Sequence, residues 1–246
     1  MMAVFDAVDY DQHSLLEALK ASPDQEIEVL NLNGHRYLGC GWKNSKRLVL
    51  RGTAGNNLGA FADGPTILLY GNGQEGVGNT MSDGEIVVYG RVGDIAGYGM
   101  RGGGLYIRDD AGYRLGIHMK AYQDKRPVIV VGGQAGAFVG EYMAGGTIIV
   151  LGVNGSNRSL IGPYCGTGMY EGEIYMRGEV PRRHLAENTK TEVLHGEKDL
   201  QSILPYLMRF AAHFSYDIDL ILAEPFTRLT AVDKRIFSHM YTGFTG

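Results

Sequence analysis

The stretch ILLYGNGQEGVGNTMSDGEIVVYG, residues 67–90, contains one complete copy of the unit from which most of the chain is built. A short aliphatic run ends in a glycine, a glycine-rich segment follows, and the next aliphatic run begins. Seven such runs occur, and they end at residues 52, 71, 90, 109, 132, 152 and 178, with Asp109 in one glycine position. The steps between these ends are 19, 19, 19, 23, 20 and 26 residues. A nearly constant period of this size is typical of a solenoid.

The apolar residues inside each run alternate in a way that assigns the two faces of a strand. Side chains of a strand point alternately to opposite faces, so residues two and four positions before the end of a run share a face. These positions are apolar in every run: Leu48 and Leu50, Ile67 and Leu69, Ile86 and Val88, Leu105 and Ile107, Val128 and Val130, Ile148 and Val150, and Ile174 and Met176. We expect them to point into the solenoid. The outward position three before the end is also apolar, so we expect that face to be covered.

The length of the repeat predicts the type of solenoid. About nineteen residues are too few for a strand and a full crossover helix, but they suit one strand and its turns. Glycine accounts for 37 of the 246 residues, and tight corners favour glycine because it adopts positive φ at no steric cost. The sequence therefore predicts an all-β solenoid of the single-stranded parallel β-helix type, with a short N-terminal helix and a helical C-terminal tail.

The two ends of the chain have a different pattern. Residues 11–20 predict a short helix with Asp11 as its N-cap, and residues 27–34 predict an incomplete first coil. The segment 179–199 is charged and lacks periodicity, which predicts a linker. Helical spacing then follows, with Pro205 expected to kink or restart the helix, at Leu200, Ile203, Leu204, Leu207, Phe210, Ala211 and Phe214.

These patterns divide the chain into three parts. We expect an N-terminal helical cap at 1–26, a parallel β-helix at 27–180, and a linker with a helical tail at 181–246. Because the open ends of a solenoid expose unpaired strand edges, the helical segments are expected to cap the two ends or dock beside them. A partner-binding role for the C-terminal helix is the alternative.

Composition limits the class of protein. A net charge of −4 and a pI near 6.0 argue against a nucleic-acid-binding surface. No apolar stretch is long enough to span a membrane, and the first residues lack the features of a signal peptide, so we expect a cytoplasmic protein. The two cysteines, Cys40 and Cys165, predict neither a disulfide framework nor a metal site.

Several motifs suggest chemistry, but each has a structural interpretation that we favour. Gly71–Gly76 and Gly97–Gly102 match G-x-G-x-x-G, yet no helix is expected to follow either one, as dinucleotide binding requires. His118 lies in an enlarged coil, where insertions often carry function, and Asp109-Asp110 is interpreted as a turn pair. We therefore assign no catalytic, cofactor-binding or metal-binding residue to this chain.

The turns resemble a known family. Residues 52–61, 71–84 and 93–103 are similar to successive turns of the GXGXG domain, which forms the C-terminal part of the glutamate synthase large subunit. The most specific match is Glu141-Tyr142-Met143 before the double glycine Gly145-Gly146. The resemblance covers about residues 27–178 and implies a right-handed parallel β-helix. Asp109 departs from the pattern, as does the apolar segment Gly136–Val139.

The resemblance also implies a function. In that family, chemistry takes place on other domains: glutamine is hydrolysed in an amidotransferase domain, and the imine formed from ammonia and 2-oxoglutarate is reduced on FMN. The chain lacks both domains and the iron–sulfur cysteines, so it looks like a stand-alone structural subunit. We expect an amidotransferase chain and a chain with FMN and iron–sulfur clusters as partners, with a homo-oligomer also open.

Three alternatives remain open from the sequence. The chain is also similar to subunits of N-methylglutamate synthase-type complexes and to the C subunit of formylmethanofuran dehydrogenase. It could instead act alone on carbohydrate, as some β-helix proteins do. Against this last possibility, the outward column one position before each run end lacks clustered carboxylates; it consists of Arg51, Tyr70, Tyr89, Arg108, Val131, Leu151 and Arg177.

Overall fold

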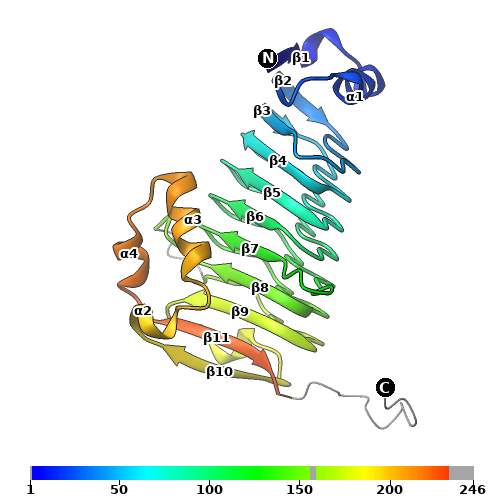
Figure 1. Cartoon of the computed structure of the whole chain (residues 1–246). Coiled ribbons are helices and arrows are strands. Elements are labelled where there is room, and N and C mark those ends of the chain that lie inside the picture. Colours follow the sequence, from blue (N-terminus) through cyan, green and yellow to red (C-terminus); the bar gives the residue numbers. More distant parts are fainter. Residues whose placement is uncertain (1, 156–158, 233–246) are drawn as a thin grey trace, which may run out of the picture.

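The computed structural model describes residues 2–155 and 159–232 and is a β-solenoid of about seven turns (Figure 1). The strands are β1 (Met2–Asp6), β2 (Glu26–His35), β3 (Arg47–Ala54), β4 (Asp63–Tyr70), β5 (Asp83–Val88), β6 (Gly104–Ile107), β7 (Val128–Val131), β8 (Ala144–Val150), β9 (Glu171–Arg177), β10 (Thr189–Leu194) and β11 (Phe226–Ala231). The helices are α1 (Gln12–Ala21), α2 (Gly196–Asp199), α3 (Leu204–Phe214) and α4 (Ile218–Leu222), with short 3₁₀ turns at Ala7–Asp9 and Arg182–His184. The predicted fold class is confirmed.

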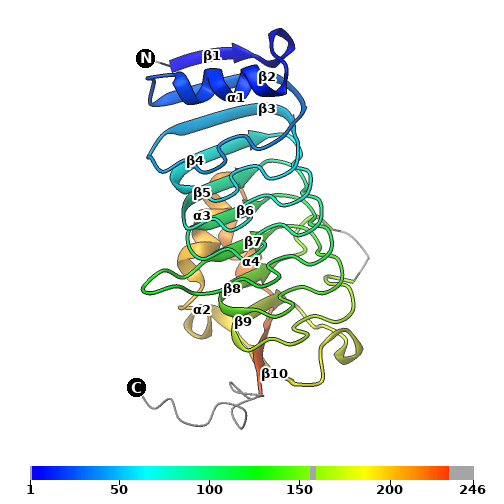
Figure 2. The ribbon, with the colours of Figure 1, turned by 90° about the vertical axis from the view of Figure 1, so that its right-hand side faces the viewer.

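All of these strands form one sheet in the order β1 to β9, then β11, then β10. Strands β1 to β9 are parallel, each hydrogen-bonded to the strand of the next coil. The turns stack in register on one side of the sheet, and α3 lies on the other side (Figures 1 and 2). No helix in the described ranges is long and apolar enough to cross a membrane.

The interior of the solenoid is a continuous apolar column between the sheet and the stacked turns. The sheet contributes the inward-facing residues of each strand, such as Ile86 and Val88, which are fully buried. The turns contribute a row of methionines that repeats from coil to coil: Met81, Met100, Met119, Met143 and Met169. Because each coil shares this column with its neighbours, none of the coils has a core of its own.

Glycines on the turn side let neighbouring coils approach closely. Gly97 adopts a left-handed backbone with φ of 69° and donates a 2.8 Å hydrogen bond to the Val77 carbonyl of the preceding coil. A Cβ at Gly97 would lie 2.3 Å from Cδ1 of Ile129. The same left-handed glycine and backward hydrogen bond recur at Gly59, Gly78, Gly116, Gly140 and Gly166. These glycines hold the coil spacing, so the high glycine content is a property of the fold.

The predicted inward register is correct in every coil except one. In β7 the inward residues are Ile129 and Val131, which align with Leu105 and Ile107 of β6. The predicted pair, Val128 and Val130, instead faces α3 on the outer side of the sheet. The coil ends at Gly133 and not at Gly132, because Gly133 bonds back to Asp109.

The outer face of the sheet carries a second apolar cluster, which confirms that this face is covered. The outward residues Val49, Leu68, Val87 and Tyr106 belong to it, and α3 packs on it with Leu207, Phe210 and Ala211. A Cβ at Gly132 would lie 2.7 Å from Cζ of Phe210. Phe210 therefore approaches the β7 corner at a point that only glycine leaves open.

The two ends of the solenoid differ, and the C-terminal end is not built as the sequence predicts. Helix α1 packs against the first end of the interior column, and β1 remains the edge strand of the sheet there. At the N-terminal end, α1 begins with the predicted cap, since the Asp11 carboxylate accepts hydrogen bonds from the backbone N–H groups of His13 and Ser14. At the other end, β11 pairs antiparallel with β9, and β10 pairs antiparallel with β11. The predicted linker thus contains strand β10. Pro205 lies in the first turn of α3, where proline is tolerated, and residues 233–246 of the predicted tail lie outside the described ranges.

A small ionic cluster fixes α3 to the sheet. The Glu85 carboxylate of β5 pairs with Arg209, and His213 Nε2 lies 3.3 Å from Glu85 Oε1. Burial raises the pKa of the Glu85 carboxyl, but the neighbouring His213 and Arg209 outweigh it and hold the pKa below its ordinary value of 4.5. The ionised carboxylate therefore stabilises the folded state.

We expect Val88→Asp to abolish folding, because it places an unpaired carboxylate in the interior column at a cost of several kcal/mol. Tyr89→Asp should cost less, since Tyr89 is only partly buried, stacked on Tyr70 and edge-on to Phe214. Urea unfolding followed by circular dichroism measures both. Equal losses in the two variants would contradict the register of β5.

We expect Glu85→Gln to reduce the free energy of unfolding near neutral pH. Because the folded pKa of Glu85 is depressed, its ionic contribution is complete above the unfolded pKa of about 4.5 and is lost as the pH falls through the folded value. The difference between wild type and variant should therefore shrink below about pH 4.5. Urea titrations between about pH 3 and 8 test this; a difference that does not change with pH would show that the contribution is not ionic.

Candidate functional site

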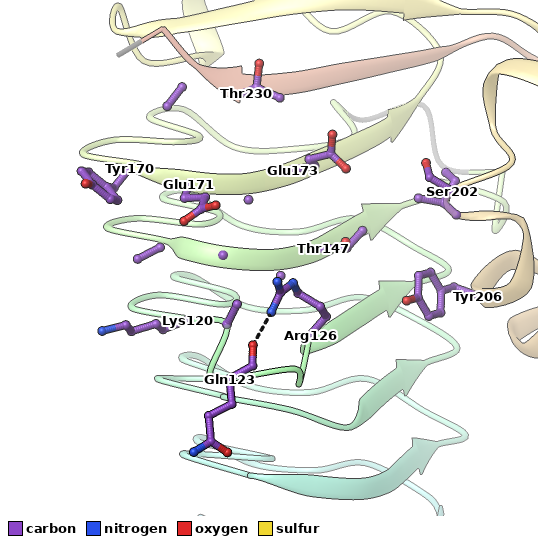
Figure 3. Close-up of a pocket in the computed structure, with 17 residues that line it drawn as sticks. Lys120, Gln123, Arg126, Thr147, Tyr170, Glu171, Glu173, Ser202, Tyr206 and Thr230 are labelled. Carbon is purple, nitrogen blue, oxygen red and sulfur yellow. Dashed lines mark hydrogen bonds between the residues drawn. The ribbon is translucent and has the colours of Figure 1, made fainter. Parts of the chain in front are cut away.

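A cavity of about 830 Å³ opens where β8 and β9 begin, beside the loop that joins α2 to α3 (Figure 3). We call it the strand-start pocket. Five segments far apart in the sequence form it: the loop after Met119, the start of β8, the start of β9, the residues around Ser202, and the end of β11. Its polar side chains are Lys120, Gln123, Arg126, Thr147, Tyr170, Glu171, Glu173, Ser202, Tyr206 and Thr230.

The pocket brings opposite charges together without pairing all of them. Arg126 Nη1 donates to the carbonyls of Gln123 and Lys125 at 3.0 and 3.2 Å, which leaves its other N–H groups available. Figure 3 shows its guanidinium directed toward β8 and, beyond it, the strand β9 that carries Glu171 and Glu173. In the ranges 2–155 and 159–232, neither Lys120 nor Glu171 has an ion-pair partner. Glu173 accepts a 2.9 Å hydrogen bond from the Tyr175 hydroxyl.

The enlarged coil supplies the basic side of the pocket. Its extra residues form a tight hairpin in which the backbones of Tyr122 and Lys125 exchange two hydrogen bonds. Lys125 Nζ lies 3.3 Å from Asp63 Oδ1 and 3.0 Å from Asp83 Oδ2, which ties the hairpin to two earlier coils. These contacts place Arg126 on the boundary with an adjoining cavity of about 490 Å³, which is also lined by Glu85 and Arg209.

The side chains of the strand-start pocket suit binding more than covalent chemistry. Among the described residues that line it there is no cysteine or histidine, so Ser202 has no imidazole base beside it. The Ser202 hydroxyl lies 3.3 Å from the Tyr175 hydroxyl. The arrangement can accept a carboxylate at Arg126 and a hydrogen-bond donor at Glu171, as an extended segment of protein would offer.

The first G-x-G-x-x-G match is accounted for by coil packing. A Cβ at Gly71 would lie 1.8 Å from the Gly52 carbonyl oxygen of the previous coil. One at Gly76 would lie 2.7 Å from the Asn57 side chain. In both matches the next regular element is a strand, β5 or β6, and not the helix that a dinucleotide site requires.

His118 lies on the outside of the enlarged coil. It is exposed and has a left-handed backbone with φ of 55°. Its ring stacks on Tyr142 at 5.2 Å and meets the edge of Tyr98 at 5.8 Å. The histidine thus belongs to an aromatic stack that links successive turns, and it lies outside the strand-start pocket.

The two aspartates of the Asp109-Asp110 pair have separate structural partners. Asp109 pairs with the adjacent Arg108, with Nε 3.0 Å from Oδ1. Asp110 accepts a 2.9 Å hydrogen bond from the backbone of Gln134 in the next coil. Asn72 and Asp94 accept equivalent bonds from the backbones of Arg91 and Tyr113. The side chains of Asp110, Asn72 and Asp94 therefore join corners of successive coils.

The cysteines and the possible metal ligands of the described residues do not come together at one site. Cys165 is fully buried, which raises the pKa of its thiol to about 12, and Cys40 is a separate, partly buried thiol. Within the described ranges, no group of three or more His, Cys, Asp or Glu side chains could hold a metal ion.

The outward column does not offer free aromatic faces to a sugar. The guanidinium of Arg51 lies over the Tyr70 ring at 4.8 Å, and Tyr70 stacks on Tyr89 at 4.4 Å. Arg51 is also paired with Glu28 at 2.6 Å. The ring faces of this column are thus largely taken up by contacts within the protein.

The sequence contained only one signal for the strand-start pocket, the enlarged coil. The period and the alternation identify only positions that repeat from coil to coil. Arg126 lies on an insertion, Glu171 at the start of β9 and Tyr206 on α3, so none of them occupies such a position. Their proximity depends on α3 folding back over the sheet. No spacing between them is characteristic of a site, so the sequence pattern does not predict them.

We expect Lys125→Ala to free the hairpin while leaving the solenoid folded. The two ion pairs are partly exposed, so the loss of stability should stay below about 1 kcal/mol. Amide hydrogen exchange of residues 120–127 should become faster. Lys120→Ala, which removes an unpaired cation from the same hairpin, serves as the control. Unchanged exchange in Lys125→Ala would show that the carboxylates do not hold the hairpin.

The chain is similar to known proteins in two ways. It is 41% identical to an uncharacterized protein of Methanocaldococcus jannaschii, over 97% of this chain and 96% of that protein. It is 32% identical to ferredoxin-dependent glutamate synthase 2 of Synechocystis and 30% identical to the NADPH glutamate synthase large chain of Bacillus subtilis. These matches cover 69% and 80% of this chain, but only 11% and 14% of the two synthases.

The family assignment follows from a match to a family profile. The profile of the GXGXG motif family matches residues 30–232, which include the solenoid from β3 onward together with α3 and β11. The same residues contain the stacked left-handed glycines and the corner hydrogen bonds described above. This chain belongs to the GXGXG motif family and is related to a segment of the glutamate synthase large chain.

Proposed function

We propose that this chain is a non-catalytic assembly subunit of a glutamate synthase-like complex. The observation that supports this most is its relationship to a small part, 11–14%, of two glutamate synthases, while its own length is close to that of the Methanocaldococcus protein. In this proposal the transfer of the glutamine amide nitrogen to 2-oxoglutarate takes place on partner chains, one with an amidotransferase site and one with FMN and iron–sulfur clusters.

The side chains of the solenoid are consistent with such a role. Its left-handed glycines, the carboxylates of Asp94 and Asp110 and its aromatic stacks make contacts between neighbouring coils. The strand-start pocket is different, because Arg126, Lys120 and Glu171 surround a large open cavity without pairing with one another. In the proposed complex, this pocket receives a polar segment of a partner chain.

Co-purification tests the proposal. An affinity-tagged chain produced in its source organism should bring down an amidotransferase chain and a flavin-containing chain, seen by mass spectrometry and visible absorbance. The same chain produced alone should be colourless. Recovery of tungsten or molybdenum in the complex would instead indicate the formylmethanofuran dehydrogenase type. A chain that purifies alone and binds glycans would contradict the assembly role.

Charge reversal tests the part played by the pocket. Arg126→Glu should lower the yield of co-purified partner at least several-fold, since it removes the cation that a partner carboxylate would meet. Arg91→Glu is a matched control, because Arg91 is also exposed but lies on a corner outside the pocket. Equal yields with both variants would show that the partner binds elsewhere.

A further inference from the structure

The two ends of the sheet expose different edge strands. Strand β1 pairs only with β2, and β10 pairs only with β11, so each leaves one side of its backbone without a strand partner in the described structure. An edge strand presents free N–H and C=O groups that can pair with another strand. Proteins limit such pairing with charged side chains, proline or bulges on the edge.

Strand β10 has this protection along its length, whereas the one charged residue of β1 is Asp6 at its end. Lys190 and Glu192 are exposed on it, and Glu192 is paired with Arg228 of β11. Residues 2–5 of β1 are Met-Ala-Val-Phe, with no charge, proline or glycine. Met2 and Val4 are 49% and 54% exposed, and Val8, just beyond the strand, is 73% exposed. The N-terminal edge is therefore apolar over residues 2–5, and one side of its backbone has no strand partner in the described structure.

We propose that β1 is a self-association surface, on which a second copy of this chain adds its own β1 in antiparallel orientation. The two-fold axis passes at Val4, and the two solenoids become one continuous sheet. A two-fold arrangement uses the same edge of both molecules and closes at the dimer. Pairing β1 of one copy with β10 of another would instead leave free edges and continue as a filament.

The sequence of β1 is complementary to itself in this register. Val4 lies opposite Val4 of the second copy, and Ala3 lies opposite Phe5. Ala3 and Phe5 are partly buried and pack against the interior column, so a small and a large side chain would meet where that column ends. Asp6, at the end of the strand, already accepts hydrogen bonds from Asn31 and from the backbone of Val8. No residue from 2 to 5 brings a like charge to the pairing.

Sedimentation equilibrium on the purified chain tests the proposal. Between about 1 µM and 1 mM, a range suited to a small interface, the wild type should shift from monomer to dimer and no further. Val4→Lys places two ammonium groups opposite each other and should raise the dimer dissociation constant at least tenfold. Val193→Lys on β10 is the matched control, because Val193 is 53% exposed, and it should leave the dimer unchanged.

Three results would overturn the proposal: a wild type that stays monomeric throughout, a dimer that Val4→Lys leaves intact, or one that Val193→Lys dissociates. Circular dichroism of Val4→Lys checks that the solenoid stays folded.

A cysteine cross-link tests the register without depending on the lysine variant. Val4→Cys should form a disulfide-linked dimer under mild oxidation, because position 4 lies opposite its own copy. Wild type, which contains the buried Cys165 and the partly buried Cys40, and Val193→Cys should remain uncross-linked under the same conditions. Failure of Val4→Cys to cross-link at concentrations where the wild type is dimeric would exclude this register.

Discussion

Every coil of this protein depends on its neighbours for an apolar interior and for partners of its backbone groups. A single strand with its turns buries almost nothing, whereas seven stacked coils share one column of aliphatic and methionine side chains. Close stacking is possible only if the corners carry no Cβ at the points of contact. Gly97 adopts a left-handed backbone at one corner, and a Cβ at Gly71 would clash with the preceding coil at another. Both glycines are therefore required by the close stacking of the coils.

The same constraint explains how much of the fold could be predicted. The inward columns are visible in the sequence because neighbouring coils require an apolar residue at the same two positions. The prediction failed in β7, where all four residues from Val128 to Val131 are apolar and two glycines follow. Both faces of β7 are buried, one by the interior column and one by α3, so alternation was lost and either glycine could end the coil.

The C-terminal part was less predictable because its order depends on tertiary contacts. Strand β10 has four exposed residues between two buried ones, so the pattern lacks the alternation of a half-buried strand. Strand β10 forms because its backbone pairs with β11, and β11 is held in place by pairing with β9. The strand-start pocket has the same origin. Arg126 is held near Glu171 by an insertion, and Tyr206 reaches them only because α3 packs on the outer cluster.

The longer coil has a consequence for folding fidelity. In a repeat of nearly equal units, each strand is a plausible neighbour for several others, and pairing that skips one unit would cost little at the sheet. The hairpin between Lys120 and Pro127 reduces this degeneracy. Lys125 can meet Asp63 and Asp83 together only when all intervening coils are present and in order. The irregular coil therefore favours the correct order of strands over arrangements in which a strand pairs with the wrong coil.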